Sequence, residues 1–356
     1  MKKIVINGIA LSNLNNISGI PRFCRELILR LDRLFGSDFV VEYLYMEDAE
    51  NLILGLNELK NIIPVEVKKS KRFMALNLKV IPKYLKSNDA ICVNFAPEAV
   101  NTKEQILTIH DLRPALFKGG DSFKTKLKYK INLNLAKKKS LKILTISNYQ
   151  KELIKDYLKL NDSQVCVIYC GWEHLNNIET DETIFERNLQ IKKGEYFYTI
   201  GSLAPHKNFK WILEVAKRNE NKQFIIAGGK NLKAWKDNIE TDEIKNVHFI
   251  GYVTDEENKA LLSNCKAFLF PSKYEGFGLP PLEALACGVP IIISNATCLP
   301  EIYENSAHYI NPDDYEVDLD KLLNEPVAPA EKILQKCSWD IAAKQVFEIL
   351  KKFVEE

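Results

Sequence analysis

Several short runs of this sequence are apolar at almost every position, and they alternate with amphipathic helical segments along the whole chain. The run at residues 291–293, three consecutive isoleucines, offers no polar face to solvent. Strands of this kind are buried on both faces, which is typical of a parallel sheet covered by helices on each side. The alternation, continued over 356 residues, therefore predicts two doubly wound α/β domains.

The expected elements follow from the change between a two-residue and a 3.6-residue hydrophobic period. The expected strands are residues 3–7, 39–45, 90–94, 105–110, 142–147 and 165–169 in the first half, and 196–201, 224–228, 247–251, 267–271 and 289–294 in the second. The expected helices are residues 20–35, 123–138, 149–160, 209–218, 255–264, 280–287 and about 341–353.

The boundary between the two expected domains lies after Gly171. Residues 172–193 follow it, and their acidic run indicates a linker or a loose insertion. We therefore expect residues 1–171 to form the first domain and residues 172–340 the second.

The two halves differ in charge although the whole chain is nearly neutral. Lys and Arg number 49 against 47 Asp and Glu, a net of +2, which argues against a general nucleic-acid binder. Residues 1–170 carry 28 basic and 17 acidic side chains, a net of +11, while residues 171–356 carry 21 and 30, a net of −9. The total therefore averages a basic half and an acidic half.

The cysteines and the apolar runs indicate a reducing compartment. No stretch approaches the roughly 20 apolar residues that span a bilayer, and residues 1–7 resemble a first strand more than a signal sequence. The eight cysteines lie mostly singly in apolar patterns, and the one close pair, Cys166 and Cys170, has no second pair at a metal-binding spacing. We expect a cytoplasmic protein with reduced core cysteines.

The segment from Phe268 to Pro290 has the strongest functional pattern. An apolar strand leads into a loop that contains Gly276 and Gly278, and the helix that follows begins with prolines and ends before Gly288. In an open α/β sheet, ligands bind where such a loop joins the carboxyl end of a strand to a helix. The unpaired N–H groups at the helix terminus favour phosphate oxygens, so this loop is a candidate phosphate site.

Two carboxylates lie eight positions apart in this segment, Glu275 in the loop and Glu283 in the helix. A carboxylate beside a phosphate is unfavourable unless it accepts hydrogen bonds from ligand hydroxyls, such as those of a ribose or a hexose. The pattern therefore indicates a sugar nucleotide. The structural alternative is that Glu275 is a solvated loop residue and Glu283 a favourable charge near a helix amino terminus.

Two further strand ends carry residues suited to the same ligand. Residues 198–208 run from a strand through a glycine into a helix, and Lys207 there can neutralise a diphosphate, including the charge that develops as it leaves. The alternative is that Lys207 is a surface lysine. Residues 249–257 place Gly251 at a third strand end, and Thr254 is expected to cap the next helix.

With these residues, the sequence resembles the retaining glycosyltransferases of the GT-B fold, in the large group four that includes bacterial mannosyl-, glucosyl-, galactosyl- and rhamnosyltransferases. The resemblance is close over residues 195–312 and looser in the first half. It rests on the Glu-x7-Glu element from Glu275 to Glu283, with Gly-Phe-Gly-Leu inside it, and on the Pro-x-Lys-Asn at residues 205–208. It implies two Rossmann-like domains facing across a cleft: the first for the acceptor, joined by the final helix, and the second for the nucleotide sugar.

The resemblance also implies roles for individual residues. Glu283 would bind the ribose, Glu275 the hydroxyls of the donor sugar, and Lys207 the diphosphate. His110 would face the transferred sugar, so the implied catalytic set is His110, Lys207 and Glu275. The implied donor-binding set is Gly19, Ser202, His206, Lys207, Tyr252, Val253, Glu275, Gly276, Phe277, Gly278, Leu279 and Glu283.

The sequence departs from the family pattern at three places. His206 stands where the family commonly has arginine, so its charge is partial near neutral pH. Ser18 precedes Gly19 where a second glycine is frequent, and Cys170 replaces a common asparagine before Gly171. These three positions belong to the contacts that the resemblance implies with the phosphates and at the hinge between the two domains, so the departures bear on those contacts and leave the resemblance to the family intact.

The reaction that the resemblance implies retains configuration at the anomeric carbon. It points to front-face displacement, in which the leaving phosphate helps to deprotonate the acceptor hydroxyl. Lys207 and helix amino termini would stabilise the leaving diphosphate. No cofactor and no metal are expected, because these groups supply the positive potential.

Residues 118–142 bear on the acceptor, since they carry nine lysines against one acid, with apolar side chains between them. A basic amphipathic helix can lie on an anionic membrane surface, so a peripheral position on the inner face of a membrane is one expectation. The alternative is a solvated helix face whose aromatic side chains enter the core.

The leading hypothesis is therefore a retaining hexosyltransferase that uses a nucleotide-diphosphate sugar and acts on a lipid-linked or surface-polysaccharide precursor. One alternative is a GT-B enzyme of another type, such as a sugar-nucleotide epimerase or a phosphorylase. Another is a non-catalytic nucleotide-binding scaffold. Nucleic acid is not an expected partner, because the basic run lacks a recognition module.

Overall fold

The computed structural model describes residues 2–12, 19–47, 49, 54–68, 75–117, 122–188, 190–228 and 244–355. These residues form two compact units. The first unit takes its described residues from Met1–Phe117, Asp121–Cys170 and Cys337–Glu356, and the second takes them from Gly171–Lys336. Each unit is built on a parallel sheet, so the predicted class of two Rossmann-like α/β domains is confirmed.

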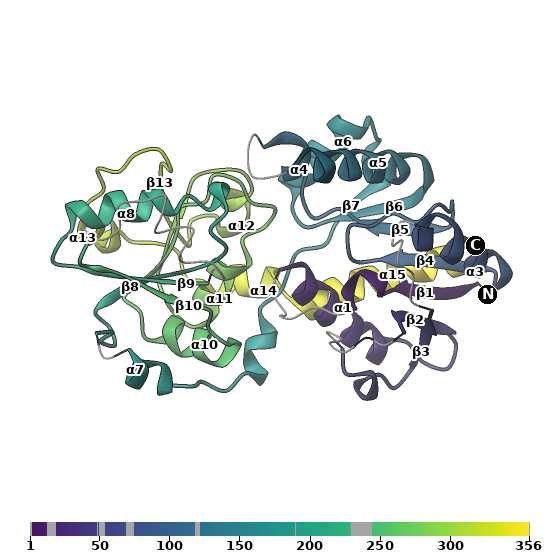
Figure 1. Cartoon of the computed structure of the whole chain (residues 1–356), viewed down its shortest axis with the longest axis horizontal. Helices are drawn as coiled ribbons and strands as arrows, with labels where there is room; N and C mark the ends of the chain where they lie inside the picture. Colours follow the sequence, from purple (N-terminus) through teal and green to yellow (C-terminus); the bar gives the residue numbers. More distant parts are fainter. Residues whose placement is uncertain are drawn as a thin grey trace. The chain divides into compact units, whose positions relative to one another are not determined.

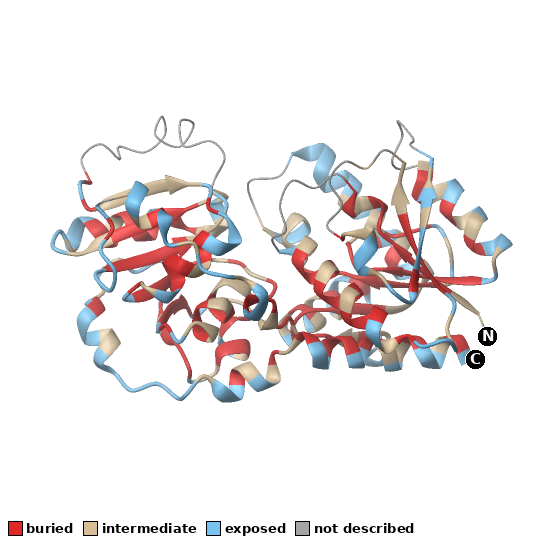
Figure 2. Cartoon of the chain, turned by 90° about the horizontal axis from the view of Figure 1, so that it is seen from below, coloured by how far each residue is buried: buried red, intermediate tan, exposed pale blue. Residues whose placement is uncertain are grey.

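The first unit has a seven-stranded parallel sheet in the order β3-β2-β1-β4-β5-β6-β7. Strand β1 pairs in register with the central strand β4 so that Val5 lies opposite Cys92, and both residues are fully buried. Figure 2 shows the central strands as buried along their length. The strands are β1 Lys3–Asn7, β2 Val41–Met46, β3 Ile62–Val67, β4 Ala90–Asn94, β5 Gln105–Thr108, β6 Ser140–Thr145 and β7 Val165–Val167.

Helices from both ends of the chain cover this first sheet. The last helix, α15, packs along α1, as the yellow and purple ribbons of Figure 1 show. The ring of Phe23 lies 5.9 Å from that of Trp339, and the ring of Phe35 lies 5.6 Å from that of Phe347. The helices of the unit are α1 Ile20–Leu34, α3 Ile81–Ser87, α4 Arg113–Leu116, α5 Phe123–Lys139, α6 Asn148–Leu158 and α15 Trp339–Glu355, with short helical segments η1 Ile9–Leu11, η2 Leu56–Glu58, η3 Leu76–Val80 and η4 Asp162–Gln164.

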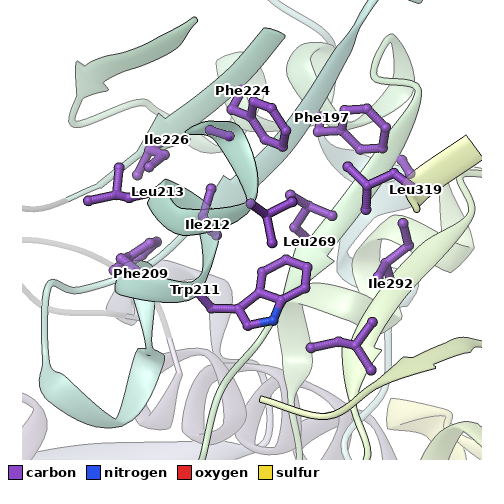
Figure 3. Packing of buried hydrophobic residues seen from close by; sticks show 14 of the residues in the cluster. Phe197, Phe209, Trp211, Ile212, Leu213, Phe224, Ile226, Leu269, Ile292 and Leu319 are labelled. Carbon is purple, nitrogen blue, oxygen red and sulfur yellow. The ribbon is translucent and has the colours of Figure 1, made fainter. Parts of the chain in front are cut away.

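The second unit has a six-stranded parallel sheet in the order β10-β9-β8-β11-β12-β13. One face of this sheet is covered by α8 and α13, and Figure 3 shows Trp211 and Ile212 of α8 in one apolar cluster with Phe197, Phe224 and Leu269 of the strands. The strands are β8 Tyr196–Ile200, β9 Gln223–Ala227, β10 Val247–Gly251, β11 Ala267–Phe270, β12 Ile291–Ser294 and β13 His308–Ile310.

The helices of the second unit connect these strands. Thr254 accepts a hydrogen bond from the backbone N–H of Glu257, so its predicted role as a helix cap is confirmed. The helices are α7 Thr183–Arg187, α8 Phe209–Arg218, α10 Asp255–Ser263, α11 Leu279–Ala286, α12 Leu299–Tyr303, α13 Leu319–Asn324 and α14 Glu331–Lys336, with η5 Glu173–Asn177 and η6 Pro205–Lys207.

The prediction of a linker or loose insertion at residues 172–193 is wrong. This segment contains η5 and α7, and it is bound to the rest of the second unit. Lys259 of α10 donates to the carbonyl oxygens of Leu175 at 2.9 Å and Ile178 at 2.6 Å, and Trp172 donates through Nε1 to the carbonyl oxygen of Leu334 at 3.0 Å. Its acidic residues are mostly exposed. They dominate the composition of the segment, and for this reason the sequence did not indicate that the segment packs against the second unit.

Candidate functional site

Lys207 and Glu275 meet at one edge of the second sheet. Lys207 ends η6, in the connection that follows β8, and Glu275 lies in the loop after the neighbouring parallel strand β11. The carboxyl ends of parallel strands share an edge, so the two loops are brought together. Lys207 Nζ donates to Glu275 Oε1 at 2.7 Å, and the two side chains are only 20% and 11% exposed. Neither residue is the solvated surface residue that the structural alternatives described.

The backbone around Lys207 is held from several directions. The next residue, Asn208, has a φ of +55° and a buried side chain. Its Nδ2 donates to the carbonyl oxygens of Pro271 at 3.1 Å and Pro312 at 2.8 Å. The Lys207 ammonium group lies 5.2 Å from the centroid of the Phe270 ring, a favourable cation–π position. The cation is therefore fixed by both its charge partner and its backbone.

The loop that carries Glu275 is tied to the carboxyl end of β12. The Glu275 N–H donates to Thr297 Oγ1 at 3.2 Å, and Cys298 Sγ donates to the Glu275 carbonyl oxygen at 3.4 Å. Burial raises the pKa of the Cys298 thiol well above its usual range, so this group is a thiol that supports the loop. Neither residue was predicted from the sequence, although both follow a predicted strand that neighbours β11.

Gly278 is required by the packing of this loop as well as by its conformation. Its φ is +90°, and a Cβ atom there would lie 2.7 Å from Leu299 Cδ2. Tyr303 also donates its hydroxyl to the Gly278 carbonyl oxygen. A glycine was expected here because it lets the backbone approach a ligand. The structure shows a second reason, the close contact of Gly278 with Leu299 and Tyr303 of α12.

The amino terminus of α11 offers fewer amide donors than an ordinary helix. Gly278 is its N-cap, and Pro280 and Pro281 occupy the second and third helical positions. Prolines have no N–H group, so two of the four donors that a helix start leaves unpaired are missing. The backbone donors that remain there for an anion belong to Gly278 and Leu279, two members of the predicted donor-binding set.

Glu283 has a hydrogen-bond partner, His174, that was not predicted from the sequence. His174 Nε2 lies 3.0 Å from Glu283 Oε1, and the two side chains are 3% and 13% exposed. His174 belongs to η5, inside the segment interpreted as a linker. No local signal marked it, because a single histidine in an acidic, polar stretch shows no periodicity. The Glu283 carboxylate is thus held by a side chain from a distant segment, in addition to lying near the start of a helix.

The remaining predicted donor-binding residues of the second unit gather at the same edge of the sheet. Ser202 and His206 follow β8, Tyr252 and Val253 follow β10, and Gly276 and Phe277 follow β11. Tyr252 is 60% exposed and Val253 is buried, so a ligand at this edge would meet the tyrosine ring but mainly the backbone of the valine.

His110 and Gly19 belong to the first unit. The His110 side chain is buried, its Nε2 lies 2.8 Å from the Phe95 carbonyl oxygen, and its ring lies 4.8 Å from that of Phe23. A carbonyl only accepts hydrogen bonds, so Nε2 carries the proton and Nδ1 is the acceptor of the neutral ring. Burial lowers the pKa of His110 to about 4, which keeps it neutral at physiological pH. Gly19 has a φ of +57° and precedes α1.

The described residues contain no group of three or more His, Cys, Asp or Glu side chains placed to hold a metal ion. The sequence has one Asp-x-Asp, at residues 318–320, and both its carboxylates have structural partners. Asp318 caps α13, and Asp320 pairs with Lys222 and Lys266, which lower its pKa to about 2.

The lysine-rich helix α5 has apolar side chains both in the core and on the surface. Leu133 and Ala136 are buried in the core, whereas Phe123, Leu127 and Ile131 are 80%, 48% and 41% exposed. Lys118 and Asp121 of the predicted basic segment lie outside the described residues. In the part of the chain that the structure describes, no helix is both long and apolar enough to cross a lipid bilayer.

Lys207, Glu275 and Glu283 lie in a segment that matches the model of a known protein family. Residues 180–336 match the model for glycosyl transferases group 1, so the second unit carries a domain of that class. Among curated proteins, the chain is similar to the O-antigen chain mannosyltransferase RfbU of Salmonella typhimurium, with 31% identity over 216 residues, 60% of this chain and 58% of that protein. It is also similar to O-antigen chain mannosyltransferase B of Escherichia coli, with 28% identity over 186 residues, 49% of this chain and 48% of that protein.

The chain thus spans 58% of the length of the first relative and 48% of the length of the second. Among solved structures, sucrose-phosphate synthase from Thermosynechococcus elongatus matches with a TM-score of 0.75 at 16% identity, over 100% of both chains. At this identity the likeness concerns the fold, and it assigns the two Rossmann-like units to the GT-B class.

Proposed function

We propose that this chain is a retaining, metal-independent glycosyltransferase that moves a hexose from a nucleotide-diphosphate sugar to a hydroxyl of a glycan acceptor. The observation that carries the proposal is the partly buried pair of Lys207 and Glu275, 2.7 Å apart at the carboxyl edge of a parallel sheet. Both residues lie inside the segment that matches the group 1 family. A cation and a carboxylate at this edge suit a diphosphate and the hydroxyls of its sugar.

The pair also suggests how the donor engages. A diphosphate carries more negative charge than one carboxylate, so it competes with Glu275 for Lys207. Once Lys207 turns to the diphosphate, Glu275 is released to accept hydrogen bonds from the donor sugar. Lys207 and the amides of Gly278 and Leu279 then stabilise the charge that develops on the leaving group, so no metal is required.

The other residues take complementary roles. Glu283, oriented by His174, binds the ribose hydroxyls, and the backbone near Tyr252 meets the base. His110, neutral and with Nδ1 as an acceptor, meets the transferred sugar. The second unit thus binds the nucleotide sugar and the first unit binds the acceptor.

Mannose is the first donor sugar to test. The names of the two O-antigen mannosyltransferases support this choice, and they also support an acceptor that is a precursor of a surface polysaccharide. A lipid-linked acceptor would place the enzyme in the cytoplasm, peripheral on the inner face of the membrane. The exposed apolar and basic side chains of α5 support that placement.

A donor screen tests this proposal. GDP-mannose and a panel of UDP- and dTDP-sugars are added to the purified protein, and the melting temperature is followed, because a ligand bound to the folded state raises it by mass action. We expect one nucleotide sugar to stabilise the protein well above the others. No stabilisation by any of them at millimolar concentration would contradict the proposal.

The Glu275→Ala variant then separates catalysis from binding. We expect it to lose transfer almost completely while it still binds the nucleoside diphosphate, because the sugar is the part of the donor that Glu275 contacts and Lys207 remains to bind the diphosphate. Nuclear magnetic resonance of the product should show the anomeric configuration of the donor. Unchanged turnover would remove Glu275 from the site, and an inverted product would exclude the retaining reaction.

A further inference from the structure

Thr297, in the connection that follows β12, has a backbone conformation that its side chain disfavours. Its φ is +55°, in the left-handed region that residues other than glycine seldom adopt. Five described residues other than glycine have a positive φ, and Thr297 is the one among them whose side chain branches at Cβ. A β-branched residue in this region is an outlier, and such strain persists only where the surrounding structure fixes the residue.

A tight turn places Thr297 in this conformation. The Leu299 N–H donates to the Ala296 carbonyl oxygen at 3.3 Å, so residues 296–299 form a turn in which Thr297 is the second residue. Turns with a positive φ at the second residue normally have glycine, asparagine or aspartate there. Each of these residues would be less strained than threonine, so the turn alone does not account for Thr297.

The side chain of Thr297 makes a hydrogen bond that glycine cannot make. Thr297 Oγ1 accepts from the Glu275 N–H at 3.2 Å, and the next residue, Cys298, donates through Sγ to the Glu275 carbonyl oxygen at 3.4 Å. Both polar groups of the Glu275 backbone are therefore bound by consecutive residues of the turn. The strained residue thus contacts the residue that binds the donor sugar in the proposed function.

Helix α12, which follows the turn, is fixed against the other end of the same loop. Leu299 packs so closely on Gly278 that a Cβ atom at residue 278 would lie 2.7 Å from it, and the Tyr303 hydroxyl donates to the Gly278 carbonyl oxygen. The turn therefore contacts the loop at Glu275, and α12 contacts it at Gly278. A change of φ at Thr297 would move Glu275 relative to α12.

The bond from Thr297 matters most when Glu275 changes its partner. The Glu275 carboxylate accepts from Lys207 at 2.7 Å, and in the proposed function the diphosphate of the donor takes Lys207 away from it. The carboxylate then needs a fixed backbone to meet the sugar hydroxyls, because a misplacement of about 1 Å can cost about 100-fold in rate.

We infer that Thr297 is a positioning residue for Glu275. Its hydroxyl holds the Glu275 backbone in place while the carboxylate passes from Lys207 to the donor sugar, and the strain at Thr297 accompanies this bond. The inference rests on the proposed function, because it assigns a task to a further residue of the same site. It predicts that catalysis depends on the hydroxyl, whereas strain depends on the branch at Cβ.

Four side chains at position 297 separate the hydroxyl from the branch. Threonine has both, serine has only the hydroxyl, valine has only the branch and glycine has neither. Thr297→Val and Thr297→Gly should lower kcat by about 10- to 100-fold, whereas Thr297→Ser should transfer at about the wild-type rate. Any pattern in which transfer does not follow the hydroxyl would overturn the inference.

Melting temperatures separate this role from a structural one. Glycine adopts a positive φ without strain, so Thr297→Gly should melt at a higher temperature than Thr297→Val although both lose transfer to the same extent. If the losses of transfer ran parallel to losses of stability, Thr297 would serve the fold alone, and the inference would fail.

Thr102→Val is the matched control. Thr102 Oγ1 accepts from the Glu104 N–H at 3.2 Å, a bond of the same kind and length in the first unit. This variant should keep the wild-type kcat and KM. A loss of transfer equal to that of Thr297→Val would overturn the inference, because the loss would then not depend on Glu275.

Hydrogen exchange tests the contact without any ligand or reaction. Exchange of the Glu275 amide, followed by nuclear magnetic resonance, should be about tenfold faster in Thr297→Val and Thr297→Gly than in the wild type and in Thr297→Ser. Unchanged exchange in the first two variants would show that the hydroxyl does not hold this backbone, and would overturn the inference.

Binding of the donor separates this inference from the proposed function. The wild type should bind the nucleotide sugar found in the donor screen more tightly than the corresponding nucleoside diphosphate, and titration calorimetry should show this preference reduced about tenfold in Thr297→Val and Thr297→Gly. An unchanged preference defeats only the inference. If the wild type binds no nucleotide sugar, the proposed function fails, and the exchange at Glu275 still decides whether Thr297 holds that residue.

Discussion

The candidate site of the second unit contains charged side chains with polar partners, whereas that of the first unit contains a neutral histidine. In the second unit, Lys207 is paired with Glu275, and Glu283 is hydrogen bonded to His174, so charged groups meet across elements. In the first unit, His110 is buried, donates to a backbone carbonyl oxygen and is neutral because burial lowers its pKa.

The two sites would therefore accept a ligand in different ways. In the second unit the charges are held in internal pairs, so a phosphate that bound Lys207 would take the place of Glu275, and the partly buried lysine would keep an anionic partner throughout. The first unit presents an uncharged hydrogen-bonding group that needs no such exchange. The contrast suits a charged donor on one side of the reaction and a neutral sugar hydroxyl on the other.

The largest expected effect comes from removing the cation of the second unit. Lys207→Ala should lower the rate of transfer by about 100- to 1000-fold, because the leaving diphosphate loses a charged hydrogen-bond donor. Steady-state kinetics with the donor found in the screen measures the loss. Lys217→Ala, which removes a half-exposed lysine paired with Glu214, is the matched control. A loss below tenfold would mean that the charge of Lys207 contributes little to transfer, which would contradict the contrast between a charged site in the second unit and a neutral one in the first.

The neutral histidine of the first unit should make stability depend on pH. The pKa of His110 is about 4 in the folded protein against 6.5 for an ordinary histidine, so the unfolded chain binds more protons between these values. Stability is complete above pH 6.5 and falls as the pH drops toward 4, by about 3 kcal/mol. Urea unfolding of the wild type and of His110→Gln across this range gives the contribution as a difference. A parallel pH dependence in the variant would contradict a buried, neutral His110.

The smallest expected effect concerns the hydrogen bond between His174 and Glu283. Loss of one hydrogen bond to a charged group costs about 1.5 kcal/mol, so His174→Ala should weaken nucleotide binding by about tenfold. His174→Gln keeps a donor and should restore part of the affinity. His248→Ala is the control, since His248 makes a similar bond to Gln223 at the amino end of β10. A raised KM with unchanged kcat would indicate positioning of the ribose. A fall in kcat alone would contradict that role.

The sequence predicted the buried strands and the long helices well because their residues obey a single period. The predicted helix at residues 209–218 has the observed bounds of α8, and the all-isoleucine run became β12. The strands β3 and β13 were overlooked for physical reasons. Strand β3 lies at an edge of the sheet with Pro64 in it, and β13 has three residues, so neither has a clear pattern.

The candidate site was predictable only where its residues follow strands. Lys207, Glu275 and Glu283 stand in motifs at strand ends, and the structure brings the first two into contact. His174, Thr297 and Cys298 depend on contacts between segments that are far apart in the sequence. No period or motif records such contacts, because they follow from the order of strands in the sheet.

The position of α15 has a consequence for the order in which the protein is made. Phe23 of α1 and Phe35, which directly follows this helix, are covered by Trp339 and Phe347, and these two residues are translated after the whole second unit, Gly171–Lys336. At ordinary translation speeds that interval is on the order of 10 s. The second unit can therefore complete its fold while the first still exposes two phenylalanine rings. A ribosome that stops before residue 339 leaves a chain suited to capture by chaperones or to aggregation.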